Sequence, residues 1–401
     1  MTNDLLFSSI EQIGSLYRKK EISPVEVTKA TLERLNDVEP KLNAFITVLS
    51  DQAIEQAKQA EALFLQGEDT GKLTGIPVSV KDIFMTKGIR TSLGSRIMQD
   101  FVPDYDADIY TALRKSGAVL FGKNNMLEFA YGSVHPDYGQ CNNPWDIQRT
   151  AGGSSTGSGA SVAAGIGFAS IGTDTGGSIR GPATFCGIVG LKPTHEKVSR
   201  KGVFPLSHSL DHVGPLTRTV RDNAAVLEAI STDPLNFDSI FTGSIKGTKI
   251  GVIKKLMDLP LDREVLSLVN NAIEQLRSLG AEIIEVEIPG IESIGRAGLT
   301  LVLAEASFYH KEWHPHRADD YAPGTYTNVK EGFNISAMSY LEALEKRREF
   351  IETVNGVSRK LIFWFAQHCL IRQPRTIQHL KKGILTPLLE PSHLTYPVIR
   401  H

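Results

Sequence analysis

The feature that most constrains the fold of this chain is a block of small residues between positions 151 and 190. The block holds 12 of the chain's 35 glycines, interleaved with alanine and serine. A flexible linker could have this composition, but apolar pieces interrupt the glycines, namely SVAA, GFASIG and CGIVG. Because small residues let backbones approach closely, we expect a tight helix, a buried strand and a turn within a packed domain.

Strands and helices are predicted to alternate on both sides of this block. Predicted strands cover 42–48, 75–84, 167–172, 248–253 and 281–289, and a helix followed by a short strand covers 111–125. Predicted helices begin at capping-box patterns after Ser8 and Ser23, the second running to about Asn36, and also cover 51–66, 262–279, 294–312 and 336–356. Residues 319–333 between the last two helices are predicted to form a loop. This order predicts an α/β fold, with a large mixed, mostly parallel central sheet covered by helices.

Composition excludes several classes of function. Lys and Arg number 43 and Asp and Glu 45, so a net charge of −2 argues against direct nucleic-acid binding or a basic membrane anchor. No apolar run is long enough for a transmembrane helix, and the N-terminus lacks the features of a secretory signal. Three cysteines, Cys141, Cys186 and Cys369, form neither a disulfide framework nor a metal pair. We therefore expect a cytoplasmic protein without membrane contact.

Cofactor and metal motifs are missing from the sequence. It contains neither a phosphate-binding G-x-x-x-x-G-K-[ST] loop nor a G-x-G-x-x-G spacing among the glycines of the block. His310, His314 and His316 flank Pro315, which breaks helical presentation, so a solvated loop of histidines is expected. No cofactor and no metal are predicted.

Two serines of the block could carry nucleophilic chemistry. The stretch Gly153–Gly157 matches the G-x-S-x-G elbow, but the residues before it read as a loop, where an elbow needs a strand. Ser178 has better surroundings, because it follows a predicted strand and a turn with two glycines, and a helix is expected to begin there. Unpaired backbone N–H groups at such a position favour a developing anion. A glycine turn that serves packing alone would give the same pattern.

A serine nucleophile needs a base, and the sequence offers two kinds. His195, His208 and His212 lie downstream, but none has an obviously buried position at the end of a strand. Lys81 ends an apolar strand, and burial there would lower its pKa toward neutrality. The alternative is that Lys81 forms an ordinary pair with an acid such as Asp82.

Taken together, three segments resemble the amidase signature family. They are GIPVSVKD around Lys81, GGSSTGSGAS around Ser154 and GTDTGGSIRGPATFCGIVGLKPT around Ser178. The resemblance covers about residues 5–357. One departure is Thr156, where the family more often has glycine.

The resemblance implies a catalytic triad and its surroundings. Ser178 would be the nucleophile, Ser154 the bridging serine on a cis peptide, and Lys81 the base. The family's oxyanion hole corresponds to the backbone N–H groups of Thr175, Gly176, Gly177 and Ser178. Supporting positions in the same network correspond to Ser155, Asp174 and Arg180.

The resemblance also implies the function and its partners. The substrate would be a small carboxylic amide, cleaved through an acyl-enzyme. Two segments, 208–227 and 304–323, look more like stand-alone amidases, for which a homodimer is possible. The alternatives are a relative of the A subunit of glutamyl-tRNA amidotransferase, which would have partner subunits, and an inactive truncated relative.

The last 44 residues differ in composition from the rest. Residues 358–401 contain seven Lys or Arg, one acidic residue and four histidines. This abrupt change suggests a frameshift near codon 358, so the C-terminal strands of the sheet are expected to be incomplete. The predicted division is therefore an N-terminal helical segment (1–70), an amidase signature core (71–357) and an atypical tail (358–401).

Overall fold

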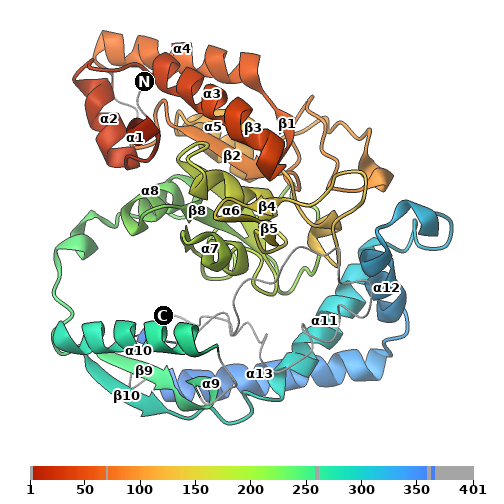
Figure 1. Ribbon diagram of the computed structural model, residues 1–401. Helices are drawn as coiled ribbons and strands as arrows, with labels where there is room; N and C mark the ends of the chain where they lie inside the picture. Colours follow the sequence, from red (N-terminus) through yellow and green to blue (C-terminus); the bar gives the residue numbers. More distant parts are fainter. Residues whose placement is uncertain (1–2, 69–70, 258–261, 359–362, 366–401) are drawn as a thin grey trace. The chain divides into compact units, whose positions relative to one another are not determined.

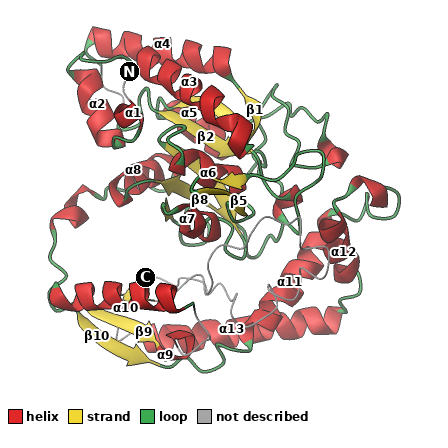
Figure 2. Ribbon diagram, in the orientation of Figure 1, coloured by secondary structure: helices red, strands yellow, loops and turns green. Residues whose placement is uncertain are grey.

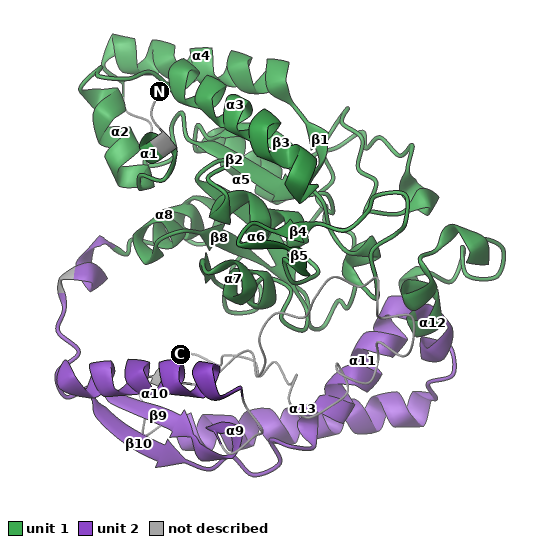
Figure 3. Cartoon of the chain, in the orientation of Figure 1, with its two compact units in different colours: residues 1–237, 309–328 green, residues 238–308, 329–401 purple. Residues whose placement is uncertain are grey.

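The computed structural model describes residues 3–68, 71–257, 262–358 and 363–365. They belong to two compact units (Figure 3): unit 1 contains residues 1–237 and 309–328, and unit 2 contains residues 238–308 and 329–401. This division differs from the predicted one. The boundaries at 237/238, 308/309 and 328/329 lie inside the predicted core, and the N-terminal helices belong to the same unit as the larger sheet.

Unit 1 is built on a six-stranded sheet with the order β1-β3-β2-β6-β8-β7 (Figure 1). The strands are β1 (Phe45–Val48), β3 (Val119–Asn124), β2 (Pro77–Lys81), β6 (Ala169–Asp174), β8 (His212–Thr217) and β7 (Val189–Gly190). β2 pairs in parallel with β3 and β6, whereas β1 and β8 run antiparallel to their neighbours. Four of the six strands therefore point the same way, and the predicted mixed, mostly parallel sheet is confirmed.

Helices pack against this sheet (Figure 2). They are α1 (Asn3–Leu6), α2 (Ile10–Arg18), α3 (Pro24–Leu42), α4 (Ser50–Gln66), α5 (Asp108–Lys115), α6 (Thr156–Ala163), α7 (Arg180–Cys186) and α8 (Val220–Ile230). α4 packs on β3, α8 packs on β8, and α6 contacts β2, β3, β6 and β8. The small residues of α6 allow this close approach, as the glycine-rich block predicted.

Helix boundaries follow the capping chemistry with two corrections. The capping box that starts α2 is formed by Ser9 and Gln12, one residue later than predicted. The box of Ser23 and Glu26 is confirmed, with Pro24 at the first helical position. α3 continues to Leu42 rather than Asn36, because the additional turns bury Leu42 in the core.

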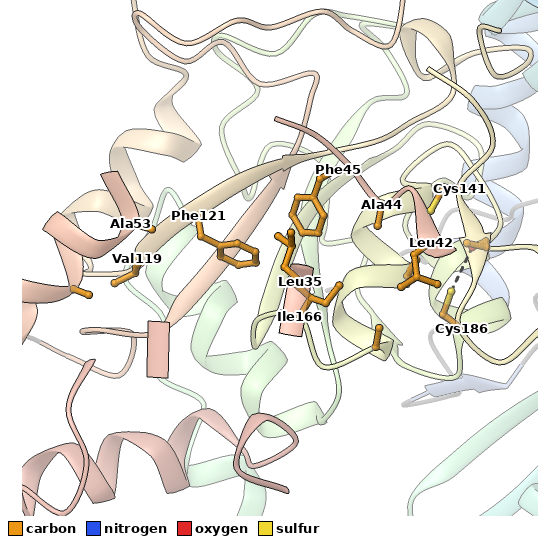
Figure 4. Close-up of a cluster of buried hydrophobic side chains, with 14 residues drawn as sticks. Leu35, Leu42, Ala44, Phe45, Ala53, Val119, Phe121, Cys141, Ile166 and Cys186 are labelled. Carbon is orange, nitrogen blue, oxygen red and sulfur yellow. Dashed lines mark hydrogen bonds between the residues drawn. The ribbon is translucent and has the colours of Figure 1, made fainter. Parts of the chain in front are cut away.

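An apolar cluster of unit 1 joins side chains from helices, strands and the glycine-rich block (Figure 4). The rings of Phe45 and Phe121 lie 5.6 Å apart, and burying each contributes about 2–3 kcal/mol to stability. Ala151 and Ala160, on either side of Ser154 in the chain, belong to the same cluster. The core therefore fixes both flanks of the segment that carries Ser154.

Unit 2 contains a three-stranded parallel sheet with the order β10-β9-β11. Its strands are β9 (Lys249–Ile253), β10 (Glu282–Val286) and β11 (Phe363–Phe365), and its helices include α9 (Lys254–Met257), α10 (Arg263–Ser278), α11 (Ile294–Tyr309) and α13 (Ala337–Ser358). Phe350 and Val354 of α13 pack with Ile253 and Leu256 in its core.

The loop predicted for the C-terminal half needs correction. Residues 319–333 contain a helix, α12 (Pro323–Gly332), since a proline fits the first helical position, where no intrahelical N–H is needed. Within the predicted tail, residues 363–365 form the short strand β11, which pairs in parallel with β9. The remainder of the predicted tail, and Cys369 with it, lies outside the described residues. Within the described parts, no helix is long and apolar enough to cross a membrane.

Candidate active site

Lys81 is the last residue of β2 and is completely buried in the middle of the sheet. Its Nζ atom lies 2.7 Å from Oγ of Ser154 and 2.8 Å from Oγ1 of Thr173. Lys81 does not form the alternative pair with Asp82. Asp82 lies 2.9 Å from Nζ of a second buried lysine, Lys123 of β3. Lys81 therefore contacts hydroxyl groups, where a neutral amine is better tolerated than an ammonium ion.

The predicted lowering of the Lys81 pKa is confirmed. Burial lowers this pKa to about 7, and the negative charges of Asp211 and Asp174 oppose that shift. Close to neutral pH, a large fraction of Lys81 therefore carries an unprotonated amine that can accept a proton.

Ser154 lies in a tightly packed loop after the hairpin of β4 (Asn142–Asn143) and β5 (Asp146–Thr150). The Gly153–Ser154 peptide bond is cis, as the resemblance implied. The strand β5 ends before this loop, so the residues that precede Ser154 are less loop-like than predicted. A Cβ atom at Gly157 would lie 2.1 Å from the carbonyl oxygen of Ala44, so only glycine fits there.

Ser155 connects this loop to two other segments. Its Oγ donates to the carbonyl oxygen of Thr173 at 3.2 Å, and its backbone N–H donates to the carbonyl oxygen of Ser178 at 3.3 Å. The structure therefore brings the segments of Ser154, Ser178 and β6 together, although they are separated in the sequence.

Ser178 lies in the loop between β6 and α7 and is partly exposed. The predicted helix starts two residues later than expected, at Arg180. One reason is that the carboxylate of Asp174 accepts hydrogen bonds from the backbone N–H groups of Ile179 and Arg180, at 3.2 and 3.4 Å. Ser178 thus belongs to a loop, and the helix does not begin at it.

The four backbone groups assigned to the oxyanion hole are not equivalent. The N–H of Gly177 donates to Oδ1 of Asp174 at 2.8 Å, so it is already engaged. The N–H groups of Thr175, Gly176 and Ser178 have no acceptor among the residues that the structure describes. Gly176 is exposed and Thr175 and Ser178 are half-buried, so a bound oxyanion could reach these three donors.

Asp174 and Arg180 form the bracing pair implied by the resemblance. Nη2 of Arg180 lies 2.8 Å from Oδ1 of the fully buried Asp174, and Nε lies 3.0 Å from Oδ2. Burial opposes the charge of Asp174. However, the Arg180 guanidinium and the N–H groups of Ile179 and Gly177 hold its pKa well below the usual range. The pair stays ionised and holds the loop after β6.

A cavity of about 190 Å³ lies beside this network. Thr173, which contacts Lys81, and Asp211, which contacts Thr175, are both in its wall. Phe204 and Val213 supply apolar surface, and Arg200 supplies a guanidinium. A small organic molecule could occupy this space next to the buried lysine.

The sequence did not reveal Thr173 or Asp211. Thr173 lies in the same glycine-rich motif as Ser178, directly after the predicted strand 167–172, and that position was the available signal. Asp211 lies 33 residues beyond Ser178 in a loop, and no local pattern links it to the site.

The expected solvated position is correct for His316, which is exposed, and wrong for His310. His310 is not solvated: it is 1% exposed, its Nδ1 lies 2.9 Å from the hydroxyl of Tyr321, and its ring packs at 4.5 Å against Phe129. Burial lowers its pKa to about 3. His212 does lie at a strand end, as the first residue of β8, and burial lowers its pKa to about 4. Aromatic packing and strand pairing, which local sequence does not show, explain both differences.

Comparison with known proteins adds independent information. The family model described as Amidase matches residues 26–361. The A subunit of glutamyl-tRNA(Gln) amidotransferase from Geobacter sp. (strain M21) is 46% identical over 312 residues, which cover 75% of this chain and 64% of that protein. The chain therefore spans less than two thirds of the length of this curated relative.

Solved structures are similar over nearly the whole chain. A crystal structure described as an amidase has a TM-score of 0.85 at 31% identity, covering 92% of this chain and 83% of that one. The A subunit of glutamyl-tRNA(Gln) amidotransferase from Thermotoga maritima has a TM-score of 0.77 at 29% identity, covering 96% and 84%. Because the family model spans most of the chain and the solved amidase is covered over four fifths of its length, this chain belongs to the amidase family.

Proposed function

We propose that this chain cleaves the carbon–nitrogen bond of a small carboxylic amide through an acyl-enzyme on Ser178. The observation that carries the proposal is the contact between Lys81 and Ser154. A completely buried amine with a pKa of about 7 lies 2.7 Å from a serine hydroxyl, whose loop is hydrogen-bonded to the backbone of Ser178. A base of this kind, held against a hydroxyl, is what activation of a serine nucleophile needs.

In this proposal protons move along a relay of three side chains. Neutral Lys81 takes the proton of Ser154, and Ser154 takes the proton of Ser178 as its Oγ attacks the amide carbon. Nζ of Lys81 lies within hydrogen-bond distance of both Ser154 (2.7 Å) and Thr173 (2.8 Å), so a neutral amine can donate to Thr173 while it accepts the proton of Ser154. The oxygen of the tetrahedral intermediate carries the negative charge and accepts hydrogen bonds from the N–H groups of Thr175, Gly176 and Ser178.

The relay then runs in reverse. The carbon–nitrogen bond breaks as Ser154 gives its proton to the leaving nitrogen and regains one from the Lys81 ammonium ion. Water attacks the remaining ester and loses a proton along the same path. The products are a carboxylic acid and an amine or ammonia, and Ser178 is restored.

A second function is favoured by the sequence comparison. Since a 46% identical relative is named as the A subunit of glutamyl-tRNA(Gln) amidotransferase, the amide could be glutamine and the released ammonia could pass to a transfer reaction. The chain would then work with partner subunits. The same cleavage chemistry at Ser178 serves both candidates.

The test is ammonia release by the purified 401-residue chain from three amides: propionamide, benzamide and glutamine. We expect turnover of at least one, and a loss of about a hundredfold or more in Ser178→Ala, which removes the nucleophile. Hydrolysis of propionamide or benzamide supports a stand-alone amidase. Hydrolysis of glutamine alone, increased by added amidotransferase partner subunits, supports the second function. A folded protein that releases no ammonia from any of them would instead be an inactive relative.

A further inference from the structure

The carboxylate of Asp211 ends a turn that faces the loop of Ser178. Its Oδ1 accepts a hydrogen bond from Oγ1 of Thr175 at 2.5 Å. The backbone N–H of Leu206 donates to Oδ2 at 2.9 Å, and that of Ser207 donates to both carboxylate oxygens at 3.1 and 3.0 Å. Asp211 is 9% exposed, so three donor groups compensate a charge that has lost most of its water.

Strand pairing fixes the place of this carboxylate. β6 and β8 are antiparallel, and their pairing ends with Asp174 opposite His212. Asp211 precedes His212, and Thr175 follows Asp174, so the two residues meet one step beyond the last pair. Their contact therefore continues the sheet into the two loops, and a movement of one loop would break it.

A second carboxylate holds the other part of the same loop. Asp174 accepts the N–H of Gly177 at 2.8 Å and that of Ile179 at 3.2 Å. Asp174 thus holds the loop after Gly176, whereas Asp211 holds it before Gly176. The unengaged N–H groups of Thr175 and Gly176 lie between these two anchors.

We propose that Asp211 is a positioning residue for the oxyanion hole, which it holds in place through the hydroxyl group of Thr175. This inference rests on the proposed function, because it assumes that an oxyanion forms on a substrate attached to Ser178. Donors of an oxyanion hole act only when they are already directed at the developing charge. A loop that is fixed at both ends satisfies that condition before the reaction begins, whereas a mobile loop would lose conformational entropy when it becomes ordered during the reaction.

Asp211 does not touch the oxyanion in this arrangement and acts only through Thr175. Loss of the contact should therefore lower kcat and leave KM nearly unchanged, because the carbonyl oxygen interacts most strongly with the hole in the transition state. General loosening of the fold would raise KM as well or reduce the amount of folded protein.

The experiment measures the rate at which a fluorophosphonate ester modifies Ser178, followed by the mass of the intact protein. In this reaction the serine oxygen bonds to phosphorus and fluoride leaves, while the phosphoryl oxygen occupies the oxyanion hole. The variants are Asp211→Ala, Thr175→Val, Thr175→Ser and the double variant Asp211→Ala/Thr175→Val. Asp222→Ala is the matched control, since Asp222 is 2% exposed and holds the N–H of Ile10 at 2.8 Å elsewhere in unit 1.

We expect Asp211→Ala and Thr175→Val each to lower the labelling rate by about tenfold to a hundredfold. The double variant should lose no more than either single one, and Thr175→Ser should recover most of the rate because it keeps the hydroxyl. Asp222→Ala should label within about twofold of the wild type. If amide hydrolysis is measurable, the loss should be in kcat and not in KM.

Labelling of Thr175→Val and Asp211→Ala at the wild-type rate would overturn the inference. If Asp211→Ala does not fold, Thr175→Val alone decides, because valine keeps the shape of threonine. Failure of the proposed function gives a different result: the wild type would not be labelled, or Ser178→Ala would be labelled equally well.

Discussion

The Nζ atom of Lys81 lies 2.7 Å from Oγ of Ser154, and neither side chain is more than 1% exposed. The residues are 73 positions apart in the chain. β2 and the loop before α6 hold the two atoms at this distance without contact with bulk water. This relationship leads to predictions about rate, stability and the coupling of mutations.

The rate of amide cleavage should rise with pH. Lys81 acts as a base only when unprotonated, and burial lowers its pKa to about 7. Below that pH, kcat/KM should increase by about tenfold per pH unit, and above it the rate should level off. The measurement is kcat/KM between about pH 5 and 9 at constant ionic strength. A flat profile would rule out Lys81 as the base.

The free energy of unfolding should also depend on pH through Lys81. The Lys81 pKa is lowered from 10.5 to about 7 in the folded chain, so between these values the unfolded chain binds more protons. The cost of burying Lys81 is therefore complete below about pH 7 and disappears as the pH approaches 10.5, with a maximum of about 5 kcal/mol. Wild-type stability should gain from this group as the pH rises from 7, whereas Lys81→Met should not.

Denaturant unfolding of both proteins at pH 6 and pH 9 checks this prediction. The free energy of unfolding of Lys81→Met, relative to that of the wild type, should be higher at pH 6 than at pH 9. An equal stability difference at the two pH values would show that Lys81 is not neutralised by folding.

Mutations along the proposed relay should not be additive. Lys81→Met and Ser154→Ala should each lower kcat by about a thousandfold, with Ser154→Ala somewhat less severe. Members of one relay act as a unit, so adding either change to Ser178→Ala should lower kcat little further. Losses that multiply would indicate that Lys81 and Ser154 act independently.

A matched pair of helical glycines tests the packing of the Ser154 segment. In Gly157→Ala of α6, the new Cβ would lie 2.1 Å from the carbonyl oxygen of Ala44, so the backbone must shift. We expect a loss of about 3 kcal/mol or more. In Gly298→Ala of α11, the new Cβ would meet no described atom within 4 Å apart from its chain neighbours and the nearby backbone of its own helix, so better helix propensity should add up to about 1 kcal/mol. Thermal unfolding of the two variants gives the comparison, and a tolerated Gly157→Ala would contradict the tight approach.

The sequence predicted those parts of the fold that short-range chemistry controls. The capping box at Ser23, the strand β9 and the helix predicted for 262–279 depend on neighbours within a few residues, and each was recognisable. The predictions were less good where distant contacts decide. α3 extends beyond Asn36 because its additional turns bury Leu42. α7 begins two residues later than predicted because Asp174 accepts a hydrogen bond from the backbone N–H of Ile179. The two-unit division also depends on contacts between segments far apart in the chain.

For the site, the sequence by itself determined the family and the residues that match its motifs, because those motifs are short and contiguous. Only the tertiary structure decided what each residue meets. It placed Lys81 against Ser154 and Thr173 and paired Asp82 with Lys123. In the folded chain the N–H of Gly177 donates to Asp174, and the hydroxyl of Thr175 donates to Asp211. The physical reason is that hydrogen bonds and desolvation act over a few ångströms in space, whereas a sequence pattern records only separation along the chain.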